Sequence, residues 1–182
     1  PVLAVTSWLQ CIADAPALRR LCLRSREEDH RCAPLLNFIL AHCAAAPTCV
    51  DDAEADAASR SGVWLTRSGI KRLEVEHFDT VTPKVLEPVL WLSTLRELRL
   101  SHLPALDDAF VRSICHRMPQ LRVFDLDFLA ITDCAFRDNA LARMSSLDEL
   151  SVRACPYVTL REPTFRWKCL SRLKTLRLDP PG

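Results

Sequence analysis

The chain is poor in glycine, with three residues in 182. It therefore contains no glycine-rich loop of the kind that cradles phosphate groups. It also lacks an apolar run long enough to cross a bilayer, a basic-then-apolar signal segment at its first residues and an Asn-x-Ser/Thr sequon. These absences give no support to nucleotide binding through such a loop, to a membrane span or to secretion.

The chain also has no excess of charge of either sign, because it contains 24 Lys and Arg residues and 23 Asp and Glu residues, for a formal net charge of +1. Bulk charge therefore gives no reason to expect nucleic acid or a membrane surface as partner. Nine cysteines are present, an odd number, set among leucine, isoleucine and phenylalanine. Such cysteines are typical of buried free thiols, which predicts an intracellular, reducing compartment: cytoplasm, nucleus or an organelle matrix.

What the chain does have is an apolar triplet that recurs at a fixed interval. The stretch LRELRLSHL, residues 95–103, carries leucines at 95, 98 and 100, a spacing that fits neither a long helix nor a regular strand. The same triplet recurs every 26 residues towards the C-terminus, 25 residues before Leu95, and 52 residues before that. Its members are Leu18, Leu21, Leu23; Ile70, Leu73, Val75; Leu95, Leu98, Leu100; Leu121, Phe124, Leu126; Leu147, Leu150, Val152; and Leu173, Leu176, Leu178. The chain is a repeat protein.

Each repeat predicts a short strand, a buried bend and a helix. The bend residues are Phe78, Leu103, Leu129 and Cys155, and helix-start chemistry follows them at Thr82–Pro83, Asp107, Thr132 and Thr159. Apolar residues at helical spacing then predict one helix through Phe110 and Met118 and another from Phe136 to Met144. A unit of this size cannot bury its apolar face alone, so neighbouring units must stack. The expected fold is an α/β solenoid, a horseshoe arc with parallel strands on the concave side and helices on the convex side.

This pattern resembles the leucine-rich repeat family. The L..L.L strand, the LDD and ITD steps and the segment ICHRMPQL are similar to its cysteine-containing subclass, which includes F-box adaptor proteins. The family often places Cys or Asn at the bend, and here only Cys155 matches. The resemblance implies a leucine-rich-repeat fold and a protein-binding role. Substrate recognition for ubiquitin ligation is an alternative that rests on the resemblance alone.

The regular repeats occupy residues 70–182, and residues 1–69 form an irregular part of the same continuous solenoid domain. That part carries a charged insertion at 24–31 and an acidic one, DDAEADAASRSG. Its residues 51–61 are expected to form a loop, and the alternative is a docking segment that becomes ordered on a basic partner. A weak strand is expected at Thr48–Val50. Uncovered solenoid ends expose core residues, so we expect a partner, or further chain, to cover one or both of them.

Residues with the chemistry for catalysis or metal binding do not form a recognisable site. His30, Cys32, His42, Cys43 and Cys49 are zinc-ligand types, but their spacing is not that of a CxxC pair, and buried thiols with solvated histidines are favoured. Cys115 and His116 are adjacent on a predicted helix and so do not face each other. His77 and His102 share a repeat position and should be near neighbours, as surface polar groups. We therefore predict no catalytic residue, no metal site and no cofactor.

The remaining candidate is the concave face, formed by the strand residues that point away from the helices. Arg99 should flank Asp125 there, and Arg122 should flank Asp148. One interpretation is a self-neutralising surface that only keeps the strands hydrated, and the other is a rigid platform that recognises a protein by its charge pattern. Trp91 lies on a helix-side segment and is expected to pack between helices. The predicted partner-binding residues are Arg19, Arg20, Lys71, Arg72, Glu74, Arg96, Glu97, Arg99, Arg122, Asp125, Asp127, Asp148, Glu149, Arg153 and Arg177.

The sequence thus predicts a non-enzymatic protein–protein interaction module, with protein partners on the concave face and at the uncovered ends. Nucleic acid is expected only indirectly, within a larger assembly. The alternative of a different class is a permanent structural subunit of a large assembly, such as a ribosomal, mitochondrial or axonemal complex.

Overall fold

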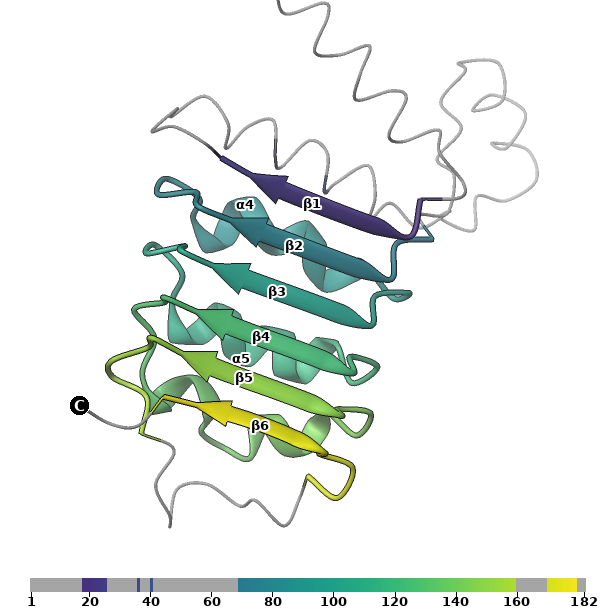
Figure 1. The fold of residues 1–182 in the computed structure, drawn as a ribbon, viewed down its shortest axis with the longest axis vertical. Coiled ribbons are helices and arrows are strands. Elements are labelled where there is room, and N and C mark those ends of the chain that lie inside the picture. Colours follow the sequence, from purple (N-terminus) through teal and green to yellow (C-terminus); the bar gives the residue numbers. More distant parts are fainter. Residues whose placement is uncertain (1–17, 26–35, 37–39, 41–68, 160–169, 180–182) are drawn as a thin grey trace, which may run out of the picture.

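The computed structural model describes residues 18–25, 36, 40, 69–159 and 170–179. In these ranges six strands form one open sheet: β1 (Arg20–Arg24), β2 (Arg72–Glu76), β3 (Glu97–Ser101), β4 (Val123–Asp127), β5 (Glu149–Arg153) and β6 (Thr175–Leu178). Every neighbouring pair is parallel, and the order in the sheet follows the order in the sequence (Figure 1). The predicted α/β class, with one short parallel strand for each apolar triplet, is confirmed.

The apolar triplets stand in register across the sheet. Leu21, Leu73, Leu98, Phe124, Leu150 and Leu176 occupy successive partner positions, and the equivalents of Leu100 form a second column beside them. Between β2 and β5 the first column is fully buried. Burying a side chain of this size contributes about 1.5–3 kcal/mol. The predicted continuous column is therefore the core of the molecule.

Strand β1 pairs directly with β2, although the two are 52 residues apart in sequence. Leu21 faces Leu73 and Leu23 faces Val75 in the parallel register. The weak strand expected at Thr48–Val50 lies outside the described residues, and the direct pairing leaves no place for a strand between β1 and β2. A double-length step along the chain therefore advances the sheet by only one strand.

The described helical segments all lie on one face of the sheet, behind the strands in Figure 1. They are α4 (Pro83–Leu86), η1 (Glu87–Trp91), α5 (Asp108–Arg117), η2 (Asp133–Phe136) and η3 (Ala140–Arg143). Asp107 caps α5 as predicted, because its carboxylate accepts a hydrogen bond of 2.8 Å from the Phe110 N–H. Thr132 caps η2 by accepting from the Cys134 N–H, whereas the Thr82 side chain makes no capping bond to α4.

The single helix predicted from Phe136 to Met144 is wrong. The chain forms two 3₁₀ turns there, η2 and η3, separated by Arg137, Asp138 and Asn139, of which the last two have φ of 59° and 54°. Aspartate and asparagine adopt this left-handed conformation more readily than other residues with a Cβ atom, and it interrupts a helix. Phe136, Met144 and the apolar residues between them at helical spacing are nevertheless buried, as the pattern required.

The turn after each strand repeats one unusual backbone conformation. The predicted bend residues are buried, and the residue before each of them has a positive φ: 61° at His77, 53° at His102, 53° at Phe128 and 49° at Ala154. The first three of these residues donate their N–H to the last residue of the next strand, at 3.0–3.1 Å. The side chains at this position therefore form a row along the edge where the strands end. In the described part of the chain, no helix has the length and apolar character needed to cross a bilayer.

Candidate functional site

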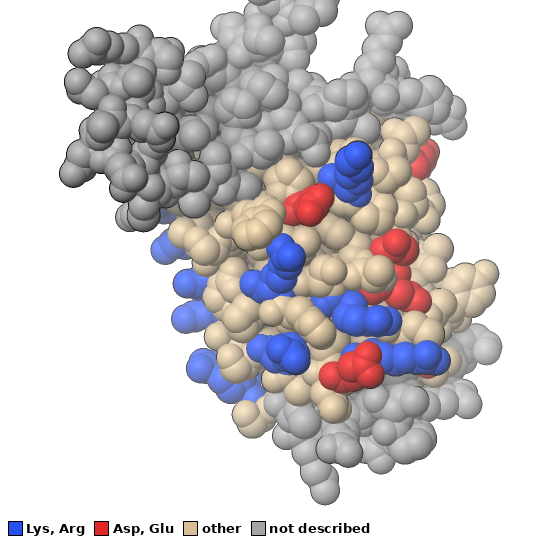
Figure 2. Space-filling view, turned by 180° about the vertical axis from the view of Figure 1, so that it is seen from behind, with Lys and Arg blue, Asp and Glu red and all other residues tan. Residues whose placement is uncertain are grey.

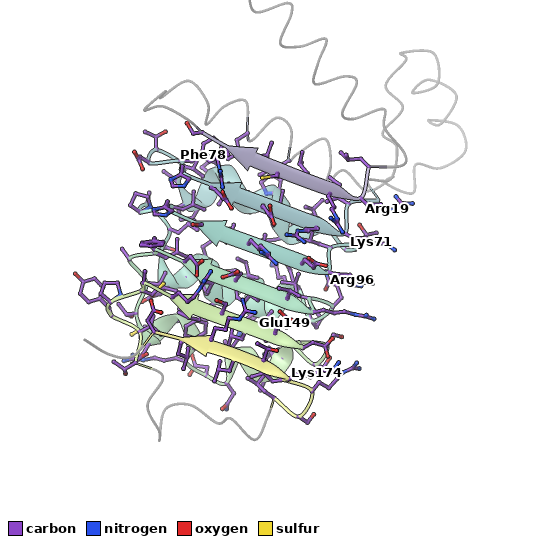
Figure 3. The ribbon with its side chains drawn as sticks, in the orientation of Figure 1. Arg19, Lys71, Phe78, Arg96, Glu149 and Lys174 are labelled. Carbon is purple, nitrogen blue, oxygen red and sulfur yellow. The ribbon has the colours of Figure 1, made fainter. Side chains whose placement is uncertain are left out.

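The outer face is the side of the sheet opposite the helices, and it carries the residues predicted to bind a partner (Figure 3). Parallel pairing arranges its side chains in rows that cross the strands. The first row, at the strand starts, is Arg19, Lys71, Arg96, Arg122, Asp148 and Lys174; the second is Arg20, Arg72, Glu97, Val123, Glu149 and Thr175; the third is Cys22, Glu74, Arg99, Asp125, Ser151 and Arg177; the fourth is Arg24, Glu76, Ser101, Asp127 and Arg153. The fold thus brings all the predicted residues together on one surface.

The first row forms a basic edge, defined as Arg19, Lys71, Arg96, Arg122 and Lys174. The backbone holds it in step, since each carbonyl from Arg19 to Asp148 accepts two N–H groups of the following strand, at 2.7–3.1 Å. From Arg19 to Arg122, the backbones of neighbouring cations are therefore about one strand spacing, roughly 4.8 Å, apart. Figure 3 shows Arg19, Lys71, Arg96 and Lys174 at the strand starts, and Figure 2 shows basic side chains along the same edge, at its left.

An ion pair interrupts this edge near β6. Lys174 Nζ lies 3.0 Å from an Asp148 carboxylate oxygen, and this contact lowers the pKa of Asp148 below its usual value. Asp148 does follow Arg122, as predicted, but through the backbone, because its N–H bonds to the Arg122 carbonyl at 2.9 Å. In the described part of the chain, Lys71 and Arg122 have no carboxylate within ion-pairing distance. Among the described residues, no ion pair therefore compensates these two charges.

Glu74 is the centre of an ion-pair network on β2 and β3. It accepts from Arg72 Nε at 2.9 Å and lies 3.6 Å from Arg99 Nε, while Arg72 also reaches Glu97 at 3.3 Å. Partial burial is the largest single influence on the pKa of Glu74 and raises it. The hydrogen bonds from Arg72 and Cys22, together with the charges of Arg72 and Arg99, outweigh burial and lower the pKa. Arg99 does sit beside Asp125 in the register, as predicted. Its ion pair, however, is with Glu74 on the other side.

The fourth row contains two further ion pairs, Arg24 with Glu76 and Arg153 with Asp127. Arg153 Nε donates to Asp127 at 3.1 Å, and the second guanidinium nitrogen donates to the other carboxylate oxygen. Each pair joins neighbouring strands. Much of the outer face is thus charge-compensated internally, which fits the self-neutralising interpretation for these rows but not for Lys71 and Arg122 in the basic edge, considering the described residues.

Asp125 differs from the other charged residues because its side chain is buried on the outer face, with 9% exposed. Burial raises the pKa of Asp125, and the neighbouring Asp127 raises it further. One carboxylate oxygen has no hydrogen-bond partner in the described structure. Its strand position predicted exposure; in the register it stands between Arg99 on β3 and Ser151 on β5.

An aromatic row, defined as His77, His102 and Phe128, lies at the edge where the strands end. The His77 and His102 rings stack with centroids 4.2 Å apart, and His102 and Phe128 with centroids 4.1 Å apart. The predicted proximity of the two histidines is confirmed. Phe128 was missed as the third member, although its place 26 residues after His102 could have revealed it.

The candidate catalytic and metal-binding residues give no site within the described residues. Cys115 is fully buried, and burial raises the pKa of its thiol to about 12, whereas His116 is exposed. His30, Cys32, His42, Cys43 and Cys49 lie outside the described ranges. In those ranges no group of three or more potential ligands is placed to hold a metal ion.

Trp91 corrects another prediction. Trp91 is 59% exposed rather than packed between helices, and the Arg117 guanidinium carbon lies 4.9 Å from the ring centroid.

No protein-family model and no curated protein matches this chain.

Proposed function

We propose that the chain is a leucine-rich-repeat solenoid, with its strands on the concave side and its helices on the convex side of an arc. We further propose that it acts inside the cell as a non-enzymatic protein-binding module. The fold part of the proposal is supported by the strand register, in which one strand follows another at each 25- or 26-residue step from β2 to β6. The sequence pattern and the parallel sheet point to the same architecture.

The basic edge is the observation that carries the binding role. Its first four residues, Arg19, Lys71, Arg96 and Arg122, directly precede the consecutive strands β1 to β4, so the backbone fixes the spacing of their charges before any partner arrives. Charges held in a fixed pattern steer association and discriminate between partners more than they add raw affinity. The ion pairs of Glu74 and Asp127 keep the adjoining side chains ordered on the same face. We therefore expect the partner to present acidic groups to the basic edge.

The test is a charge reversal that breaks no ion pair between described residues. A triple variant, Lys71→Glu with Arg96→Glu and Arg122→Glu, should lose a set of proteins that the unaltered chain recovers in quantitative affinity capture. The matched control reverses Lys84, Arg137 and Arg143, which lie on the helix side and are exposed or partly exposed. Equal recovery of all proteins by both triple variants and the unaltered chain would contradict the proposal.

A second candidate function, a permanent subunit of a larger assembly, is favoured by the outermost strand β6. Leu176 is 39% exposed and Leu178 38% exposed, although their equivalents on β2 to β5 are buried. Exposed leucines in a row are a surface that a permanent neighbour would cover. Light scattering on the purified chain separates the two functions. Aggregation relieved by Leu176→Lys and Leu178→Lys favours the subunit, and a stable monomer favours the recruitable module.

A further inference from the structure

The aromatic row ends at Phe128, although the turn conformation that carries it is repeated once more, at Ala154. His77, His102 and Phe128 stack almost in parallel, with interplanar angles of 15° and 13°. The next equivalent residue, Ala154, has the same left-handed backbone, and the Phe128 N–H bonds to the Arg153 carbonyl just before it at 3.0 Å. A fourth ring would stack on Phe128 from this position. A methyl group stands there instead, and the Phe128 ring is 54% exposed.

Carboxylates belong to residues next to Phe128 and Ala154. Arg153 donates to Asp127, and the Asp179 carboxylate accepts a hydrogen bond from the Ala154 N–H. Asp127, Asp125 and Asp179 all raise the pKa of the Arg153 guanidinium, with the hydrogen bond to Asp127 the largest influence. Three carboxyl groups thus act on one cation. A second cation would improve the charge balance beside Phe128.

We propose that the open face of Phe128, above Ala154, docks an arginine side chain of a partner protein. A guanidinium is planar, so it can stack on the ring as His102 does on the other side, and its charge suits the nearby carboxylates. The chain already makes one such contact, since Arg117 lies over Trp91 with 4.9 Å to the ring centroid. The inference rests on the proposed protein-binding function and names one chemical feature of the partner.

Short peptides can test separately whether the charge and the planarity of the guanidinium contribute to binding. The probes are five-residue capped peptides of serine and glycine whose central residue is arginine, lysine, citrulline, leucine or tyrosine. In an NMR titration of the full chain, the arginine peptide should shift the backbone amides of Phe128 and Ala154. Lysine keeps the charge without the plane, and citrulline keeps the plane without the charge. Each should bind about three- to fivefold more weakly than arginine, and leucine more weakly still.

Two variants test the position from opposite directions. Phe128→Ala removes the stacking surface, and Ala154→Phe fills the open position. The latter should fold, because Phe128 already occupies the same backbone conformation, at φ 53° against 49°. Both should abolish the preference for the arginine peptide, while Trp91→Ala, the control at another exposed aromatic ring, should leave it unchanged.

Equal binding of the arginine, lysine and leucine peptides would overturn the proposal, as would a retained arginine preference in Ala154→Phe. Tighter binding of the tyrosine peptide would overturn the choice of arginine as occupant. None of these results would touch the proposed function, which fails separately if reversing the basic edge leaves every captured protein in place. Conversely, a positive peptide titration would stand even if the basic edge had no role.

Discussion

At the scale of single residues, Asp125 shows that neighbouring residues decide whether a side chain at a given strand position is exposed or buried. Asp125 occupies the same row as Glu74 and Arg99, yet it alone of these three is buried. A buried carboxylate is costly unless it is paired, and one oxygen of Asp125 has no partner in the described structure. The residue therefore weakens the fold while it is ionised.

The replacement Asp125→Asn should raise the free energy of unfolding at neutral pH. Because burial raises the pKa of Asp125 in the folded state, the folded protein binds this proton more tightly than the unfolded chain does. The contribution of Asp125 to stability is thus largest below its unfolded pKa and is lost as pH rises through the folded pKa. The advantage of asparagine should accordingly shrink as pH falls through the raised folded pKa, and it should be gone below the unfolded pKa of about 4. Urea unfolding at several pH values measures it, and a difference that does not vary with pH would contradict the assignment.

At the scale of elements, two equivalent aspartates tie each repeat to the next one. The Asp108 carboxylate accepts from the Thr132 N–H at 2.7 Å and from its hydroxyl at 2.6 Å. Asp133 makes the same two bonds to Thr159, at 2.7 and 2.6 Å. Thr132 in turn caps η2. Asp108, at the start of α5, therefore helps to fix where η2 begins, through a contact between repeats that local sequence signals do not contain.

The replacement Asp108→Ala should lower the free energy of unfolding by about 1–3 kcal/mol. It removes two hydrogen bonds to an ionised acceptor and leaves the Thr132 N–H without its partner. The control is Asp79→Ala, at an exposed carboxylate in a strand-end turn, which should change stability by no more than about 0.5 kcal/mol. Thermal or urea unfolding followed by circular dichroism measures both. Equal effects of the two replacements would show that the hydrogen bonds between Asp108 and Thr132 do not stabilise the fold.

At the scale of the whole molecule, the sheet grows in one direction and its rows run across all the repeats. Strand order equals sequence order, so each strand from β2 to β5 contacts the strands before and after it, while β6 has one described neighbour. Basic residues gather where the strands begin, and the acidic and aromatic groups near Phe128 lie where they end. The side of the sheet where the strands begin is thus basic, and the side where they end carries acidic and aromatic groups.

In a one-dimensional stack, the stability lost when a core residue is truncated should depend on whether its strand lies in the middle or at the end of the sheet. Phe124→Ala, in the middle of the column and fully buried, should cost about 3–5 kcal/mol. Leu176→Ala, at the outer strand and 39% exposed, should cost about 1 kcal/mol or less. Urea unfolding of the two variants provides the comparison. Similar losses at both positions would contradict a stack in which each repeat contacts only its neighbours.

The sequence by itself determined the repeat interval, the buried column and the side chains of the outer face, because a short strand fixes which residues point inward. It also determined the caps at Asp107 and Thr132, which depend on residues only two or three positions away. Only the tertiary structure decided that β1 joins β2 directly and that Arg99 pairs with Glu74 and not with Asp125. These features depend on which of several neighbours across the strands a side chain meets, and such alternatives differ too little in energy for a local pattern to choose between them.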